Sequence, residues 1–155
     1  MQGGSFNLAT LNQFVGRELG VSEWILMNQQ RITEFADCTG DHQWIHVDSE
    51  RAKRESPYKS TIVHGFLTLA IVGPTSLEVW IRPAGIATAI NYGLDRVRFI
   101  APVPVDARIR NRIKLLAIDP KAGGRTLFTT ENIIEIEHHD KPALIANVLT
   151  IAVSA

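Results

Sequence analysis

The spacing of apolar and polar residues divides the chain into a helical first part and a strand-rich second part. In residues 7–19, apolar side chains recur every three or four positions, which predicts an amphipathic helix that stops at Gly20. Residues 22–27 form a short apolar run that suits a strand. The chain is therefore expected to begin with a helix that leads into a short extended segment.

Another helix is predicted to follow Asn28, because asparagine is a preferred N-cap residue. Ile32, Phe35 and Ala36 then share one face at helical spacing. Thr39-Gly40-Asp41 should end this helix, since glycine is common just beyond a helix C-terminus.

The most apolar stretch of the chain, residues 65–81, predicts a helix that is buried on all sides. Pro74 lies within this stretch and should kink the helix or end its first segment. Before it, residues 42–47 are expected to form a loop or a short extended piece. Ser49–Glu55 should form a short surface helix capped by Asp48.

From residue 87 onward, the pattern changes to period two and to runs that are typical of strands. Strands are expected at residues 87–92, 95–99, 107–118, 125–137 and 142–152. Residues 101–104 form a linker, and short turns at residues 119–124 and 138–141 join the long strands. Consecutive strands with short turns form antiparallel sheets, so the expected fold class is α+β, with a sheet curled around the buried helix.

The length of 155 residues suits one domain, which is expected to span residues 1–155. Apolar residues make up 45%, an ordinary share for a globular protein. Lys and Arg together number 16, as do Asp and Glu, so the formal net charge is zero. A nucleic-acid partner is therefore not expected, and one barrier to self-association is absent.

The cysteine content and the length of the apolar runs indicate in which cellular compartment the protein is expected. Cys38 is the only cysteine, so an intramolecular disulfide cannot form, which suits a reducing compartment. Residues 1–9 lack the basic region and apolar run of a secretory signal. The longest apolar stretch, residues 66–72, is far too short to span a membrane. We expect a cytoplasmic protein with no membrane partner.

Candidate chemistry is concentrated in residues 37–48, which contain three aspartates and two histidines. One interpretation is a metal site in which His42 and His46 share a helix face and Asp41 or Asp48 adds an oxygen ligand. A glycine break next to Asp41 argues against a continuous helix, so no bound metal is expected. A second interpretation is a surface turn with two solvated histidines.

A third interpretation is an acid/base pair formed by Asp41 and His46. A carboxylate and an imidazole can hold one water between them, and neutral imidazole accepts a proton near pH 7. Such a pair suits addition of water to a polarised double bond, which also needs donors for a developing oxyanion. Gly65 follows His64 at the predicted start of the buried helix, where backbone N–H groups lack internal partners. Packing at a crowded helix entry is the alternative explanation for this glycine.

These residues resemble the motifs of a known family. Thr39-Gly40-Asp41, His46 five positions later, and Ile62-Val63-His64-Gly65-Phe66 resemble the MaoC-type (R)-specific enoyl-CoA hydratases. The run Gly-Asp-His-Gln-Trp-Ile-His-Val-Asp is most similar to the branch that includes the nodulation protein NodN. Asn91-Tyr92-Gly93 extends the resemblance into the strands, so that it covers residues 30–105 strongly and the remainder in pattern only.

The resemblance implies a hotdog fold, in which an antiparallel sheet wraps a long central helix, and a homodimer with joined sheets. It implies that Asp41 and His46 bind the catalytic water and that the Gly65 amide contributes to the oxyanion hole. The family acts on acyl thioesters of coenzyme A or acyl carrier protein, as in fatty acid metabolism, and forms (3R)-hydroxyacyl products by syn addition. No cofactor is implied, because the thioester carrier is part of the substrate.

The chain departs from the commoner family pattern, which has Asn-Pro where this chain has Gln43 and Trp44. Trp44 is expected either to line the acyl tunnel or to anchor the loop in the core. Arg98 is a candidate contact for coenzyme A phosphates, since guanidinium groups pair well with phosphate; solvation or an ion pair with Asp95 is the alternative. His64, next to the oxyanion-hole glycine, is a further candidate substrate contact.

Two rival functions remain open at this point. In a thioesterase of the same fold, water held by Asp41 would attack the carbonyl carbon instead of the β-carbon. A non-catalytic protein would bind acyl thioesters or another protein without turnover. The presence of both Asp41 and His46 favours hydration of a trans-2-enoyl thioester, with His46 as the principal base.

Overall fold

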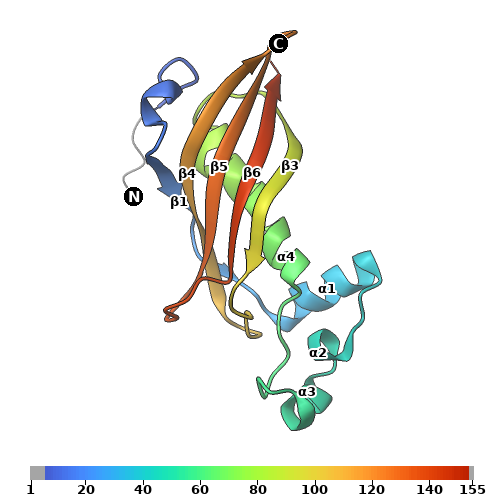
Figure 1. The fold of residues 1–155 in the computed structure, drawn as a ribbon. Coiled ribbons are helices and arrows are strands. Elements are labelled where there is room, and N and C mark those ends of the chain that lie inside the picture. Colours follow the sequence, from blue (N-terminus) through green and yellow to red (C-terminus); the bar gives the residue numbers. More distant parts are fainter. Residues whose placement is uncertain (1–5, 154–155) are drawn as a thin grey trace.

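The chain folds as one antiparallel sheet with a long helical segment across one of its faces (Figure 1). The computed structural model describes residues 6–153. The strands, in chain order, are β1 (Glu18–Val21), β2 (Ile25–Leu26), β3 (Thr88–Phe99), β4 (Arg108–Lys121), β5 (Arg125–Ile136) and β6 (Leu144–Val153). The sheet and the helical layer form the α+β architecture that the sequence predicted.

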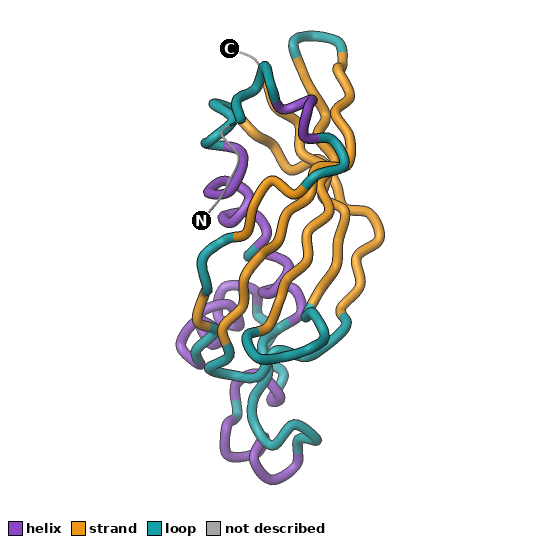
Figure 2. Tube along the Cα trace, turned by 90° about the vertical axis from the view of Figure 1, so that its left-hand side faces the viewer, coloured by secondary structure: helices purple, strands orange, loops and turns teal. Residues whose placement is uncertain are grey.

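Apart from the turn η1 near the N-terminal strand, the helical elements form two groups, one along the sheet and one at its end (Figure 2). In chain order they are η1 (Leu11–Phe14), α1 (Gln29–Thr39), α2 (Trp44–Val47), α3 (Ser49–Glu55), α4 (Gly65–Ala70), α5 (Val72–Ser76) and η2 (Leu77–Ile81). The consecutive elements α4, α5 and η2, here called the central helix, run along the sheet. Helices α1, α2 and α3 gather at the end of the sheet where the central helix begins.

The sheet has the order β1-β4-β5-β6-β3, β2 also pairs with β4, and every described pairing is antiparallel. Side chains along β5 and β6 alternate between buried and partly buried positions, which is the period of two expected for a sheet with one covered face. The covered face forms the main core with the central helix, and this core includes Ala146 and Val148 of β6 and Leu67 of α4.

Pro74 lies in α5, and the first helical segment, α4, ends at Ala70, four residues before the proline, as predicted. The backbone stays helical across the junction. Ile71, between α4 and α5, keeps right-handed helical dihedral angles, as does Leu77 at the start of η2. The helix is buried on its sheet side only, because Phe66 is 70% exposed and Leu77 is 40% exposed. The expectation of burial on all sides is therefore wrong for the single chain. Within residues 6–153, no helix is long and apolar enough to cross a bilayer.

Residues 7–19 do not form the predicted helix. Only the 3₁₀ turn η1 is helical, and the following residues pair with β4 as strand β1. The apolar positions are buried from two different elements, Leu11 from the turn and Leu19 from the strand. The N–H of Gly16 also donates to the carbonyl of Leu115 in β4 (2.8 Å). Pairing with a distant strand has therefore overridden the local helical spacing.

The helices that precede the site follow the sequence prediction in two cases and differ in one. The side chain of Asn28 accepts a hydrogen bond from the N–H of Arg31 and caps α1 (3.0 Å), and Asp48 caps α3 through the N–H of Arg51 (2.9 Å). Residues 42–47, in contrast, contain the single helical turn α2 rather than a loop or an extended piece.

Strand β3 is one bulged strand where two separate strands were predicted. Its pairing with β6 shifts register between Asn91 and Gly93 and again between Asp95 and Arg98. Arg96 adopts a positive φ of 53° inside the second irregularity. The break predicted at residues 93–94 lies next to the first irregularity, where Gly93 interrupts the run of strand-forming residues.

Candidate active site

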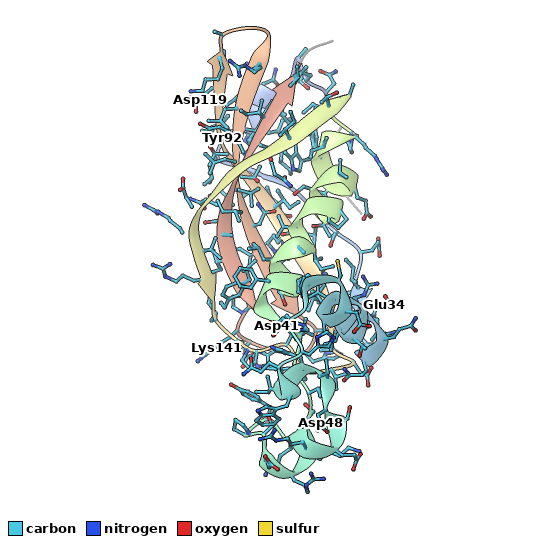
Figure 3. The ribbon with its side chains drawn as sticks, turned by 90° about the vertical axis from the view of Figure 1, so that its right-hand side faces the viewer. Glu34, Asp41, Asp48, Tyr92, Asp119 and Lys141 are labelled. Atoms are coloured by element: carbon cyan, nitrogen blue, oxygen red, sulfur yellow. The ribbon has the colours of Figure 1, made fainter. Side chains whose placement is uncertain are left out.

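Asp41 follows the C-terminus of α1, close to the start of the central helix (Figure 3). Gly40 adopts a left-handed conformation (φ 82°) that ends α1 and turns the chain. The N–H of Gln43 lies 3.4 Å from the Asp41 carboxylate, and the residue is exposed. The carboxylate therefore keeps most of its capacity to accept hydrogen bonds from a water or a ligand.

His46, in the single turn α2, is buried, with 8% of its surface exposed. Its Nδ1 lies 2.7 Å from the carbonyl oxygen of Ile62. Because a carbonyl oxygen only accepts, Nδ1 carries the hydrogen, and in the neutral ring Nε2 keeps a free lone pair. The backbone thus presents His46 as a base whose accepting atom is Nε2.

The segment that contains Ile62 is itself held by backbone hydrogen bonds. The N–H of Ile62 donates to the carbonyl of Ile45 (3.1 Å), which ties the segment to α2. The N–H of Val63 donates to the carbonyl of Val103 (2.8 Å), which ties it to the chain that precedes β4. The carbonyl that orients His46 is consequently fixed on both sides.

Gln29, in the first turn of α1, is a supporting residue that the sequence analysis missed. Its Nε2 donates to the carbonyl oxygen of His46 (2.8 Å), and its Oε1 accepts a hydrogen bond from Thr61 (2.6 Å). One side chain therefore joins α1, α2 and the segment that leads into α4. No local pattern predicts this contact, because Gln29 and His46 are 17 positions apart.

Burial lowers the pKa of His46 below its ordinary value of 6.5, and the neighbouring His64 lowers it further. The hydrogen bond to Ile62 and the nearby charge of Asp41 act in the opposite direction without reversing the shift. The lowered pKa favours the neutral imidazole at neutral pH, which is the form that can accept a proton from water.

His64, the residue before α4, contacts Asp41 and His46, and it does not line the cavity beside His46. It is 2% exposed, and its ring stacks on that of His46 with centroids 3.9 Å apart and planes at 26°. Its Nε2 lies 2.9 Å from the carbonyl oxygen of Asp41, so Nε2–H is the donor. Its Nδ1 is buried and has no hydrogen-bond partner within residues 6–153.

A cavity of about 250 Å³ lies beside His46 and the first turn of the central helix. Its walls include Gly65, Thr68 and Phe99. A Cβ atom on Gly65 would lie only 3.1 Å from Cε1 of Phe99, so a glycine allows β3 to pack closely against the helix start. The first N–H groups of α4 have no acceptor inside the helix. The cavity thus has a base on one wall and free helix amides on another.

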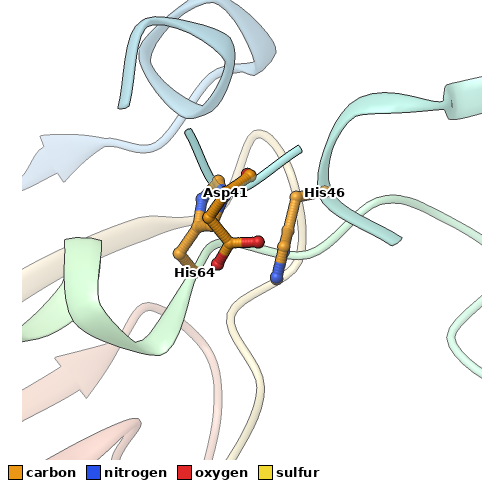
Figure 4. A group of neighbouring side chains, drawn as sticks. All are labelled: Asp41, His46 and His64. Atoms are coloured by element: carbon orange, nitrogen blue, oxygen red, sulfur yellow. The ribbon is translucent and has the colours of Figure 1, made fainter. Parts of the chain in front are cut away.

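Asp41, His46 and His64 converge at this place (Figure 4). One carboxylate oxygen of Asp41 and one ring nitrogen of each histidine all lie within 4.8 Å of one another. A water that donates to two acceptors at about 2.8 Å each spans about 4.5 Å between them. The distance between Asp41 and His46 therefore suits one shared water.

A carboxylate and two histidines are also a donor set for a transition metal. The lone pairs of imidazole lie in the ring plane, however, and two stacked rings at 26° do not direct them to one point. The ligand set considered from the sequence is wrong, because His42 pairs with Asp37 at the surface (2.8 Å) and Asp48 caps α3. The geometry suits a hydrogen-bonded water better than a metal ion.

Two predicted substrate contacts lie away from the cavity. Trp44 is partly buried, and the guanidinium of Arg51 lies 4.4 Å from its ring centroid, so it packs against α3 rather than in the core. Arg98 is exposed on β3 and donates to the carbonyl of Val97 (2.8 Å). Neither side chain lines the cavity beside His46.

Comparison with known proteins identifies close relatives. A family model described as a MaoC like domain matches residues 11–136. Nodulation protein N of Rhizobium leguminosarum bv. viciae is 43% identical over 145 residues, which cover 94% of this chain and 90% of the relative. The 3-hydroxyacyl-thioester dehydratase Z of Mycobacterium tuberculosis (strain CDC 1551 / Oshkosh) is 42% identical over 140 residues, which cover 90% of this chain and 91% of the relative.

A solved structure supports the fold. The (R)-hydratase from A. caviae involved in PHA biosynthesis matches with a TM-score of 0.68 at 17% identity, covering 87% of this chain and 95% of that chain. The architecture is therefore the hotdog fold, with a carboxylate–imidazole pair at the start of its central helix. The chain belongs to the MaoC-like dehydratase family, as its motifs predicted.

Proposed function

We propose that the protein is an (R)-specific enoyl-thioester hydratase that adds water reversibly to a trans-2-enoyl thioester. In the opposite direction it dehydrates a 3-hydroxyacyl thioester. The observation that carries this proposal is the convergence of Asp41 and His46 beside the cavity at the start of α4. Family membership and the 42% identical 3-hydroxyacyl-thioester dehydratase Z support the same reaction.

In the proposed mechanism, the reacting water lies between the Asp41 carboxylate and Nε2 of His46. Nε2 accepts one proton while the water oxygen bonds to the β-carbon, and the α,β double bond becomes an enolate. A proton then passes from the pair to the α-carbon on the same face, which gives syn addition and returns the site to its starting state. Because the two groups are adjacent, the proton is shared within a coupled pair.

The enolate places negative charge on the thioester oxygen, and Gly65 is the proposed donor to it. Its amide belongs to the first turn of α4, where N–H groups have no internal acceptor and the helix dipole favours negative charge. Donors that are fixed before the reaction stabilise such charge without reorganisation. Gly65 and His46 line the same cavity, so one bound thioester would contact both.

We propose coenzyme A or acyl carrier protein as the carrier of the acyl group, because the reaction needs a thioester to stabilise the enolate. Attack of water on the β-carbon and two proton transfers complete the reaction without any change in overall oxidation state, so no redox or metal cofactor enters the proposed mechanism. We also propose a cytoplasmic location, where the exposed thiol of Cys38 would stay reduced.

We further propose a homodimer in which a second copy of the chain covers β3. This strand ends the sheet order and is 12 residues long, so its outer backbone groups have no strand partner within residues 6–153. Exposed apolar side chains lie on it and on the adjoining central helix: Phe66, Leu77, Ile90, Tyr92, Leu94 and Phe99. Rings of the two elements meet across this surface, since the Phe66 and Phe99 centroids are 6.1 Å apart. Pairing two β3 strands would extend the sheet and bury the surface.

A hydration assay tests the proposed function. Purified protein is mixed with crotonyl-CoA and with longer trans-2-enoyl-CoAs, and the absorbance of the conjugated thioester is followed. We expect that absorbance to fall and the product to be the (3R)-hydroxyacyl thioester. Release of free thiol without a hydroxyacyl product would identify a thioesterase, and binding without turnover would identify a binding protein. Either of these results would contradict the proposal.

A further inference from the structure

His64 is a buried polar residue that the proposed chemistry does not use. Only 2% of its surface is exposed, and its Nδ1 has no partner within the described part of the chain. A buried polar atom without a partner destabilises a folded protein, and a methionine or leucine would fill such a space without that penalty. The presence of an imidazole here therefore calls for an explanation other than packing.

We propose that His64 is a positioning residue for the proposed catalytic pair, because its Nε2–H holds the backbone of Asp41 and its ring holds the plane of the His46 ring. This inference rests on the proposed hydratase function. It adds a specific element to that function: one side chain that sets the relative position of the acid and the base.

The contact with His64 is the shortest of three hydrogen bonds that Asp41 makes. The distance from Nε2 of His64 to the carbonyl oxygen of Asp41 is 2.9 Å. The N–H of Asp41 lies 3.4 Å from Oγ1 of Thr39, and the carboxylate lies 3.4 Å from the N–H of Gln43. Gly40 is held by its own N–H, which donates to the carbonyl of Ala36 (2.8 Å), whereas Asp41, one residue further, is held most closely by His64.

The contact with His46 restrains the one motion that its own hydrogen bond leaves free. The bond from Nδ1 to the carbonyl of Ile62 fixes one edge of the ring but permits tilting about that edge. The His64 ring stacks against one face at 3.9 Å, and Phe35 of α1 packs on His64 in turn at 5.1 Å. A series of three rings from α1 to α2 therefore fixes the direction of Nε2.

His64 does not act on the substrate in this arrangement. Its Nε2 is occupied by the carbonyl of Asp41, and the side chain does not line the cavity beside His46. The stack also excludes water from one face of His46, and this burial contributes to the lowered pKa of His46.

The surroundings of His46 allow this effect to be measured. His64, from the start of α4, and Asp41, from the turn after α1, are the two titratable groups that act on its charge. Helix α1 faces the pair with uncharged Gln29 and Phe35. The segment from the end of β3 to the start of β4 contributes apolar walls to the cavity.

Two substitutions separate the hydrogen bond from the ring. In His64→Gln, the amide nitrogen reaches the place of Nε2 and can still donate to Asp41. In His64→Asn, the shorter side chain falls short of that carbonyl. We expect His64→Asn to lower kcat about 10²-fold with little change in KM, because a misplacement of about 1 Å has an effect of this size. His64→Gln should keep more activity, with kcat lowered about tenfold or less.

Both variants lose the stacked ring, so water reaches His46 and its pKa should rise toward the ordinary value. The acid limb of the kcat/KM profile should therefore move to higher pH in both. An NMR titration of the His46 ring measures the same shift without turnover, which separates a failure of this inference from a failure of the proposed function. His139→Gln, at an exposed turn, is the control and should leave kcat and the titration of His46 unchanged.

Equal kcat in His64→Gln and His64→Asn would overturn the proposal, as would a His46 titration that stays at the wild-type pH in both variants. Thermal unfolding of each variant verifies that the comparison is made between folded proteins. If the wild-type chain shows no hydration but the His46 titration moves as expected, the hydratase function fails and the positioning role stands.

Discussion

Two backbone carbonyls determine the chemistry of the site at the scale of single residues. The carbonyl of Ile62 binds Nδ1 of His46, and the carbonyl of Asp41 binds Nε2 of His64. Each bond fixes which ring nitrogen carries the hydrogen in the neutral form, so the two histidines present different atoms. His46 keeps Nε2 as a free acceptor, whereas the free nitrogen of His64 is buried. In the proposed mechanism, His46 therefore transfers the proton and His64 supports it.

The pH dependence of activity follows from the lowered pKa of His46. As pH falls, Nε2 is protonated and the base is lost, so kcat/KM should decrease on the acid side. Because burial and His64 lower this pKa, the midpoint should lie below the ordinary value of 6.5. His42 is an internal comparison for an NMR titration, since its hydrogen bond to Asp37 raises its pKa. A rate profile with its acid midpoint above 6.5 would be inconsistent with this account.

The same shift links His46 to stability. The unfolded chain binds a proton at His46 at higher pH than the folded chain does, so acid favours unfolding. The contribution of His46 is fully present above the unfolded pKa and is lost as pH falls through the folded pKa. The free energy of unfolding should therefore depend on pH differently in wild type and His46→Gln, and only between the folded and unfolded pKa values of His46. Denaturant unfolding at a series of pH values measures this difference.

Gly65→Ala tests the close packing at the helix start. The added Cβ would meet Cε1 of Phe99 at 3.1 Å, so the ring must move by a few tenths of an ångström. We expect kcat/KM to fall about tenfold or more, and the free energy of unfolding to fall by about 1 kcal/mol, as is usual for overpacking. Phe99→Leu in the Gly65→Ala background should recover part of the stability. A Gly65→Ala variant with wild-type activity would contradict the requirement for a residue without a side chain at the helix start.

At the scale of elements, the site depends on how α1 supports the short turn α2. A helix of four residues has too few internal hydrogen bonds to be stable alone. Gln29 donates to the carbonyl of His46, and the backbone of Ile62 donates to Ile45, so the turn is held from both sides. The position of His46 is therefore set by tertiary contacts more than by the sequence of α2 itself.

Gln29→Leu should release this support. The substitution leaves the His46 carbonyl and the Thr61 hydroxyl without their partner, and we expect a loss of about 1–3 kcal/mol in the free energy of unfolding. The kcat of hydration should fall as well. Gln30→Leu is a matched control, because Gln30 is exposed and its side chain bonds only to Glu34 (2.9 Å) within residues 6–153. Chemical denaturation that shows equal stability for the two variants would argue against a role for Gln29.

Features with local signals were predicted correctly from the sequence, and features that depend on distant partners were not. The capping residues Asn28 and Asp48 identified α1 and α3, and period two identified the long strands. The start of β1 falls within the helix predicted for residues 7–19, because its partner strand β4 is distant in sequence: Glu18 faces Lys114, 96 positions later. The contact of Gln29 with His46 likewise has no local signal, because the two residues are 17 positions apart.

At the scale of the whole molecule, the fold brings together residues whose motifs the sequence revealed and separates others. Asp41 lies close to His46, and His46 and Gly65 line one cavity at the start of the central helix. Trp44 and Arg98 do not join them, because their contacts depend on the orientation of α2 and on the irregular backbone of β3. A motif specifies which residues are needed, whereas tertiary structure decides what surrounds them.

The proposed dimer gives a prediction at this scale. Leu94→Lys places a charge on the exposed surface of β3 and should shift the protein from dimer to monomer in light scattering coupled to size-exclusion chromatography. The reason is that a buried, unpaired charge strongly opposes association. Leu8→Lys is the matched control, since Leu8 is 50% exposed and Leu94 is 45% exposed, but Leu8 lies outside β3. A wild-type protein that is monomeric at micromolar concentration would contradict the proposed assembly.

The most direct test of the central claim compares three substitutions in the crotonyl-CoA hydration assay: Asp41→Asn, His46→Gln and, as a control, His42→Gln. If Asp41 and His46 act together on one water, each of the first two should lower kcat/KM by about 10²–10⁴-fold, the usual range for an acid/base group. His42→Gln should stay close to wild type, because that ring pairs with Asp37 at the surface. Wild-type hydration by a folded Asp41→Asn or His46→Gln variant would contradict the account.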